Sequence, residues 1–148
     1  MGETDRLKIL IAEDDNDLLA LYDISFSDLI FEKRLVRDGK AAVEVYKNWH
    51  PDIIVLDIIM PVKTGCLVLE EIREVFGDKD TTIIFSTSID DMDVVSHCAR
   101  FGIQGYIVKP FNYKMVAYEI LEFFKKTDPK KANMAQIRLQ NASRQHLP

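Results

Sequence analysis

The sequence predicts an α/β fold in which helices cover both faces of a five-stranded parallel sheet. Short apolar runs alternate with segments of helical period along residues 7–126. Three of the runs are apolar throughout, which is typical of parallel strands that are buried on both faces. The chain has 148 residues, 47% of them hydrophobic and 29% charged, enough for one ordinary domain with a buried core.

The expected strands are short and rich in Ile, Val and aromatic residues. They are residues 7–12, 33–36, 53–56, 83–85 and 106–108. The expected helices lie between them at 17–29, 40–49, 67–76, 91–101 and 112–126, with Asn112 as a candidate N-cap of the last. We expect the apolar stripe of the third helix to belong to the core; it comprises Leu67, Val68, Leu69, Ile72, Val75 and Phe76. Five β-α units at this length favour a doubly wound, flavodoxin-like sheet with strand order 2-1-3-4-5.

Composition and charge exclude several classes of protein. There are 19 Lys and Arg against 24 Asp and Glu, a net charge of −5, which argues against direct nucleic-acid binding. No apolar run approaches the roughly 20 residues of a membrane helix, and the polar start, Met1 to Arg6, does not resemble a secretory signal. Cys66 and Cys98 match no metal or redox spacing, as expected in a reducing compartment. We therefore expect a cytoplasmic protein that does not contact membranes.

The charge is unevenly distributed along the chain. Residues 1–126 hold 15 basic and 23 acidic residues, whereas residues 127–148 hold 4 basic and 1 acidic. The sequence thus predicts an acidic domain over 1–126 and a basic tail or linker over 127–148. Residues of that tail allow either a linker or an extension of the last helix.

Chemistry-bearing residues follow the expected strands. Glu13, Asp14 and Asp15 follow the first strand, Asp57 the third, Ser86 to Ser88 the fourth and Lys109 the fifth. In a doubly wound sheet these carboxyl ends converge near the reversal of strand order. Clustered carboxylates repel one another and need a cation, and an all-oxygen site suits Mg²⁺. Asp57 could then act as a nucleophile towards a phosphoryl group, with Thr87 and Lys109 balancing its charge. A plain solvated loop is the alternative for the acidic residues, and Asp15 also suits the first turn of a helix.

Four motifs in this order, ILIAEDD, IIVLDIIMP, FSTS and GYIVKPF, resemble the receiver domain of response regulators in two-component phosphorelays. The resemblance covers roughly residues 7–125. It implies that Asp57 is the phosphoacceptor and that Glu13, Asp14, Asp57 and the backbone carbonyl of Ile59 hold Mg²⁺. It also implies that Thr87 is a switch hydroxyl, that Tyr106 is a switch aromatic, and that Lys109 pairs with the phosphoryl group and precedes a cis bond to Pro110. Gly65 matches the glycine that shapes the loop after the third strand. The assignment of Thr87 depends on register, since Ser86 and Ser88 flank it, and Tyr106 could instead be a core residue.

The implied function is acceptance of a phosphoryl group from a phosphohistidine on a sensor histidine kinase or a histidine phosphotransfer protein. Phosphorylation would change a surface formed by the fourth helix, fifth strand and fifth helix, for a downstream protein, an attached output domain or a second copy of the chain. Residues 127–148 are too few to fold an effector domain, so we expect either a stand-alone receiver or part of a longer protein. By the same resemblance, Ile59 and Ile89 are apolar at positions that border the path of hydrolytic water, which predicts slow self-dephosphorylation. We expect no enzymatic activity beyond self-phosphorylation and this slow self-dephosphorylation.

Two other functions compete with this one. A Mg²⁺-dependent phosphatase of the haloacid-dehalogenase type would use Asp57 as nucleophile, but it needs a second carboxylate two residues on, where Ile59 stands. A receiver-like binding module that takes no phosphoryl group would not need the complete set of Glu13, Asp14, Asp57, Thr87 and Lys109.

Overall fold

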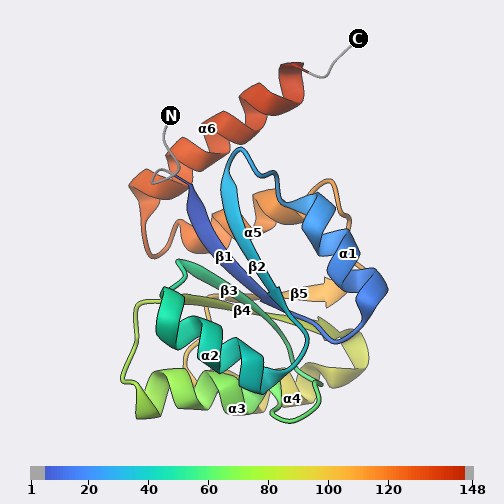
Figure 1. The fold of residues 1–148 in the computed structure, drawn as a ribbon, viewed down its shortest axis with the longest axis vertical. Coiled ribbons are helices and arrows are strands. Elements are labelled where there is room, and N and C mark those ends of the chain that lie inside the picture. Colours follow the sequence, from blue (N-terminus) through green and yellow to red (C-terminus); the bar gives the residue numbers. More distant parts are fainter. Residues whose placement is uncertain (1–5, 146–148) are drawn as a thin grey trace.

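A computed structural model describes residues 6–145 and has the expected architecture. Five parallel strands lie in the order β2-β1-β3-β4-β5, with helices on both faces (Figure 1). The strands are β1 Leu7–Ala12, β2 Phe31–Val36, β3 Ile53–Asp57, β4 Thr82–Ser88 and β5 Gly105–Lys109. The predicted doubly wound, flavodoxin-like sheet is therefore confirmed. Residues 1–5 and 146–148 lie outside the described residues. The polar start, Met1 to Arg6, therefore falls almost entirely outside them.

The helices divide between the two faces of the sheet. One face carries α1 Asn16–Ser25 and α5 Val116–Phe124; the other carries α2 Gly39–Trp49, α3 Gly65–Glu70 and α4 Met92–Cys98 (Figure 1). A π-helical segment, Glu71–Val75, continues α3, and 3₁₀ turns at Ile89–Asp91 and Ala99–Phe101 flank α4. β3 is buried at every position because helices cover both of its faces, as its unbroken apolar sequence predicts.

Several expected helix bounds were wrong. α1 ends at Ser25 rather than residue 29, because the backbone becomes extended at Phe26 and carries Phe26 and Ile30 into the core. Leu29 is 61% exposed there. α5 begins at Val116, since Asn112 caps a preceding turn by accepting from the Lys114 N–H at 2.9 Å.

The apolar stripe of the third helix was only partly predicted. Val68, Leu69 and Ile72 are fully buried, whereas Leu67, Val75 and Phe76 are 50%, 74% and 40% exposed. Only Val68, Leu69 and Ile72 face the sheet. The predicted stripe is wider than the strip of one helix that can contact a sheet.

Residues after 126 form a further helix, α6 Pro129–Gln145, which lies beyond the end of the sheet where β1 begins (Figure 1). Asp128 caps it by accepting from the Lys131 N–H at 3.0 Å, and Pro129 occupies the first turn, where no N–H is needed. Ala132, Ala135 and Leu139 are buried in the same core as α5. The division of the chain at residue 126 stays a prediction. Within residues 6–145 no helix combines the length and the apolar character that crossing a membrane requires.

Candidate functional site

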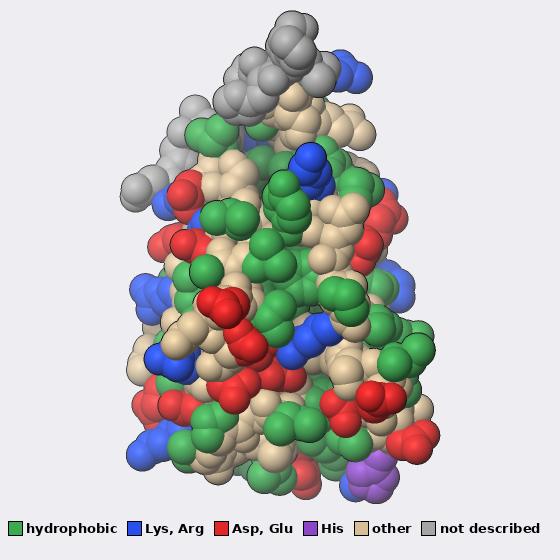
Figure 2. Space-filling view, turned by 90° about the vertical axis from the view of Figure 1, so that its right-hand side faces the viewer, with side chains coloured by type: hydrophobic (Ala, Val, Ile, Leu, Met, Phe, Trp, Pro, Cys, Tyr) green, Lys and Arg blue, Asp and Glu red, His purple; other side chains and the backbone are tan. Residues whose placement is uncertain are grey.

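Three charged side chains meet where β1, β3 and β5 end. Lys109 Nζ lies 2.7 Å from Glu13 Oε1 and 3.2 Å from Asp57 Oδ1. Glu13 and Asp57 are 1% and 7% exposed, whereas Asp14 is open to solvent. The face towards which β5 runs gathers acidic side chains beside hydrophobic and basic ones (Figure 2). The sheet thus brings together residues that are 96 positions apart at most, as the strand-end rule predicts.

The acidic cluster carries more negative charge than its one lysine balances. Oxygen atoms of Glu13, Asp14 and Asp57 lie within 4.8 Å of one another. Burial, followed by the hydrogen bond and charge of Glu13, raises the pKa of Asp57 to about 7. Burial lowers the pKa of Lys109, but its contacts with Glu13 and Asp57 outweigh burial and raise it. Three hard oxygen donors with excess negative charge and one open side fit a divalent cation such as Mg²⁺.

The loop that follows Asp57 is closed against its own strand. The Gly65 N–H donates to the Ile58 carbonyl at 2.9 Å, and a Cβ on Gly65 would lie 2.3 Å from the Asp57 carbonyl oxygen. No larger residue fits at Gly65 without moving the backbone of Asp57. Val62 has a φ of 69°, an unusual conformation for a β-branched residue. This supports the expected loop-shaping role of Gly65.

The switch candidates lie on the neighbouring strands. Thr87, at the end of β4, is 1% exposed, and its hydroxyl donates to the Ser88 carbonyl at 3.1 Å. Tyr106 on β5 is 46% exposed, so it is not a core residue. The Lys109–Pro110 peptide bond is cis, as the resemblance implies. The side chain of Ile59 is 62% exposed, and the ligand role of its carbonyl stays a prediction.

Two contacts, one described here and one in the next paragraph, were not expected from the sequence. Tyr22 on α1 donates from its hydroxyl to Ser86, beside Thr87, and both residues are buried. Burial raises the pKa of Tyr22, so it stays a neutral donor. Asp15 caps α1 by accepting from the N–H groups of Asp17 and Leu18 at 2.9 and 3.1 Å, the helix-turn role left open above.

The second unexpected contact is a disulfide between Cys66 on α3 and Cys98 on α4. Their Cα atoms are 5.6 Å apart although 32 residues separate them in sequence. The two cysteines are thus paired although their spacing matches no metal or redox motif. Short-range spacing could not reveal the pair, because it forms only when α3 and α4 pack side by side on one face of the sheet.

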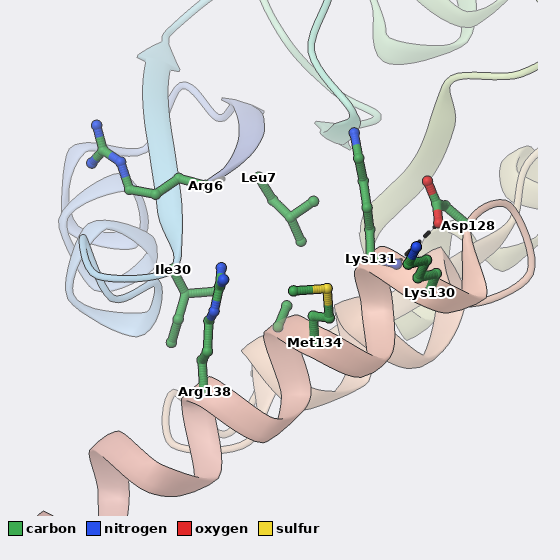
Figure 3. A pocket seen from close by; sticks show the side chains of 9 residues that line it. Arg6, Leu7, Ile30, Asp128, Lys130, Lys131, Met134 and Arg138 are labelled. Atoms are coloured by element: carbon green, nitrogen blue, oxygen red, sulfur yellow. Dashed lines mark hydrogen bonds between the residues drawn. The ribbon is translucent and has the colours of Figure 1, made fainter. Parts of the chain in front are cut away.

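One cavity in the described part of the chain lies far from the acidic cluster. It measures about 340 Å³ and opens between α6 and the start of β1, where Leu7, Ile30 and Met134 form an apolar lining (Figure 3). Arg6, Lys130, Lys131 and Arg138 surround it. The strands begin at this end of the sheet, whereas the site described above lies where they finish.

Known proteins resemble the chain in both sequence and fold. It is 31% identical over 121 residues to a probable transcriptional regulator ycf27 of Galdieria sulphuraria, covering 82% of this chain and 46% of that protein. It is 39% identical over 74 residues to the chemotaxis protein CheY of Halobacterium salinarum, covering 50% of this chain and 60% of that protein. The chain thus spans about half the length of the ycf27 regulators that it matches.

Solved structures share the fold. The chemotaxis response regulator CheY4 of Vibrio cholerae superposes with a TM-score of 0.73 at 24% identity, over 80% of this chain and 98% of that one. NtrX from Brucella abortus superposes with a TM-score of 0.75 at 20% identity, over 90% of this chain and 30% of that one. A family model, the response regulator receiver domain, matches residues 9–120. With a match over most of its length and the strand-end residues in place, this chain belongs to the response regulator receiver domain family.

Proposed function

We propose that this receiver takes a phosphoryl group from a phosphohistidine onto Asp57, with Mg²⁺ held by Glu13, Asp14, Asp57 and the Ile59 carbonyl. The observation that carries the proposal is the charge imbalance at the carboxyl end of the sheet. Buried Glu13 and Asp57 share one ammonium group, so the site has room for positive charge and lacks it. A site of this kind binds a cation first and then accepts a group that brings its own negative charge.

The transfer uses groups already in place. A carboxylate oxygen of Asp57 attacks phosphorus, the P–N bond to the donor imidazole breaks, and the imidazole leaves with the electron pair and takes a proton. Bound Mg²⁺ would neutralise charge on the transferred phosphoryl oxygens and on the carboxylates. Lys109, 3.2 Å from Asp57, would exchange part of its pairing with Asp57 for a phosphoryl oxygen.

The response would follow from rearrangement of Thr87 and Tyr106. Among the residues that the structure describes, the Thr87 hydroxyl donates to the neighbouring Ser88 carbonyl alone, a contact that a phosphoryl oxygen can replace with a stronger, charge-assisted one. Tyr106 is half-exposed and could turn inward as Thr87 moves. The population would then shift between two arrangements of α4, β5 and α5, whose surface we propose as the output.

We further propose that the donor is a sensor histidine kinase or a histidine phosphotransfer protein, which places the chain in the cytoplasm. Receiver domains are signalling domains, and we propose no catalytic turnover beyond self-phosphorylation and slow self-dephosphorylation. The output is either a separate protein, a second copy of the chain or an attached domain. The greater length of the ycf27 relatives supports an attached domain, without direct nucleic-acid contact by residues 1–126.

The test is labelling of the full chain with acetyl phosphate, followed by intact mass spectrometry. We expect one phosphoryl addition that requires Mg²⁺ and disappears in Asp57→Asn. Asp80→Asn, which removes an exposed carboxylate outside the site, is the matched control and should label normally. No labelling with Mg²⁺ present would support the non-phosphorylated binding module, whereas many turnovers of a phosphomonoester would support the phosphatase.

The lifetime of the phosphorylated state is a separate prediction. Ile59 and Ile89 are 62% and 73% exposed beside the site, and an apolar side chain there cannot orient an attacking water. We expect Ile59→Asn to shorten the lifetime roughly tenfold by supplying a hydrogen-bonding group for that water. Decay of the phosphorylated mass after removal of acetyl phosphate measures this. An unchanged lifetime, with Val62→Asn as the neighbouring exposed control, would contradict it.

A further inference from the structure

The disulfide between Cys66 and Cys98 joins the segment after Asp57 to α4, one of the elements of the proposed output surface. Cys66 follows Gly65, whose N–H closes the loop directly after Asp57. Cys98 is the last residue of α4, which a short 3₁₀ turn connects to Thr87 and Ser88 at the end of β4. One covalent bond therefore ties the Asp57 loop to the helix that follows the switch hydroxyl.

The burial of the two sulfur-bearing side chains differs. Cys98 is 1% exposed and packs in the core with Val95 and Phe85, whereas Cys66 is only partly buried. Cys66 is therefore the member of the pair that is more accessible to small thiols in solution. An exposed member that is attacked first and a buried member that completes the exchange are the arrangement that thiol–disulfide exchange needs. In a reducing compartment, disulfides are most often transient and redox-sensing.

We propose that Cys66 and Cys98 are a reversible dithiol–disulfide pair, and that its oxidation holds α4 against α3 and weakens the phosphoryl-driven switch. The switch half of this proposal rests on the function proposed above. In the disulfide-bonded structure the Thr87 hydroxyl bonds to Ser88 and Tyr106 is half-exposed. The crosslink is thus compatible with the unswitched arrangement, and any arrangement that moves α4 away from α3 must stretch or exclude it. A bond that fits one state better than the other shifts the population towards that state.

The oxidation is an exchange with a low-molecular-weight disulfide such as oxidised glutathione. The Cys66 thiolate attacks one sulfur, and one glutathione leaves as thiolate, which forms a mixed disulfide at Cys66. The Cys98 thiolate then attacks the Cys66 sulfur, and the second glutathione leaves. Two protein thiols are oxidised, one small disulfide is reduced to two thiols, and the two protons pass to the departing thiolates.

The first experiment tests the pair without any phosphoryl group. The full chain is equilibrated with oxidised glutathione or with a phosphine reductant, and free thiols are counted by iodoacetamide alkylation and mass spectrometry. Hydrogen exchange is then followed over peptides that contain α4. We expect both thiols to disappear together on oxidation, and exchange in α4 to slow by about tenfold. Three outcomes would each contradict a reversible dithiol–disulfide pair. They are thiols that stay free on oxidation, a mixed disulfide that persists at Cys66, and unchanged hydrogen exchange in α4.

The second experiment adds acetyl phosphate and Mg²⁺ to both forms. We expect the change in exchange over α4 and β5 to be several-fold smaller in the oxidised form, although Asp57 is labelled in both. Equal changes in the two forms would overturn control of the switch. Absence of labelling in both forms would contradict the proposed function instead. The first experiment would still test whether Cys66 and Cys98 form a reversible disulfide.

Cys66→Ser is the matched control, because its side chain is partly exposed and close in size to the thiol. This variant should switch equally well under oxidising and reducing conditions, as the reduced wild-type chain does. An oxidant-dependent response that persists in Cys66→Ser would overturn the proposal, since no crosslink can form there.

Discussion

Two buried charged clusters lie at opposite ends of the same sheet and differ in how fully their charges are satisfied. Near the amino ends of β4 and β5, Arg73 donates to the carbonyls of Gly102, Asp78 and Thr81 at 2.7 to 3.0 Å, and to the Gln104 side chain at 3.1 Å. At the carboxyl ends, Glu13 and Asp57 share Lys109. The first cluster has acceptors for every group of its guanidinium, whereas the second lacks positive charge.

The pKa of one carboxylate in each cluster shows the same contrast. Burial would raise the pKa of Asp78, but hydrogen bonds from Thr81, Tyr46 and the Asp80 N–H hold it at about 2. Burial and Glu13 raise the pKa of Asp57 to about 7. A satisfied cluster stabilises the fold, whereas an unsatisfied one costs stability and keeps a place for a ligand. This difference separates a structural charge cluster from a functional site.

The largest expected effect is loss of the Arg73 cluster. Arg73→Met keeps the apolar stem but leaves three backbone carbonyls without their donor, so we expect the free energy of unfolding to fall by about 3 kcal/mol or more. Urea denaturation measures it. Arg100→Met, at an exposed position, is the control and should change stability by less than about 0.5 kcal/mol. A loss below about 1 kcal/mol for Arg73→Met would show that water replaces the guanidinium.

The second prediction concerns the opposite cluster without metal. The pKa of Asp57 is higher in the folded chain, about 7, than in the unfolded chain, so the folded state binds its proton more tightly. Its contribution to stability is therefore present below about pH 4 and lost as pH rises to about 7. With a metal chelator present, we expect Asp57→Asn to stabilise the fold by about 2 kcal/mol at pH 8 and by much less at pH 5.

Denaturation of both proteins across this pH range is the measurement. Asp78→Asn is the matched control with the opposite sign, because a depressed pKa stabilises above about pH 4 and that stability is lost as pH falls through about 2. Asp78→Asn should destabilise at neutral pH. If Asp57→Asn also destabilised at pH 8, the carboxylate would be satisfied and the contrast between the clusters would fail.

The smallest effect tests a single bond in the Arg73 cluster. The Tyr46 hydroxyl donates to Asp78 Oδ2 at 2.7 Å, and Tyr46→Phe removes that donor while keeping the buried ring. We expect a loss of about 1 kcal/mol at neutral pH and an upward shift of the acid unfolding midpoint. Tyr118→Phe, whose hydroxyl makes a long contact with Ser143 at the surface, should be nearly neutral. Equal effects of the two variants in acid titrations would contradict the special role of Tyr46.

The candidate site was largely predictable because its residues follow strands directly. Glu13, Asp57, Thr87 and Lys109 are each the last residue of a strand, the one before it, or the one just after it, and parallel strands bring those positions together. The Arg73 cluster was not predictable in this way. Three of its acceptors are backbone carbonyls, which carry no signature in the sequence.

By itself, the alternation of apolar runs and helical periods determined the fold class, and the strand-end positions determined which side chains meet at the candidate site. The tertiary structure decided what depends on contacts between distant segments. It paired Cys66 with Cys98, packed α6 against the core, closed the Asp57 loop around Gly65, and ended α1 four residues early. Local pattern reports the period and polarity of one segment, whereas these features arise from which helices the sheet sets side by side.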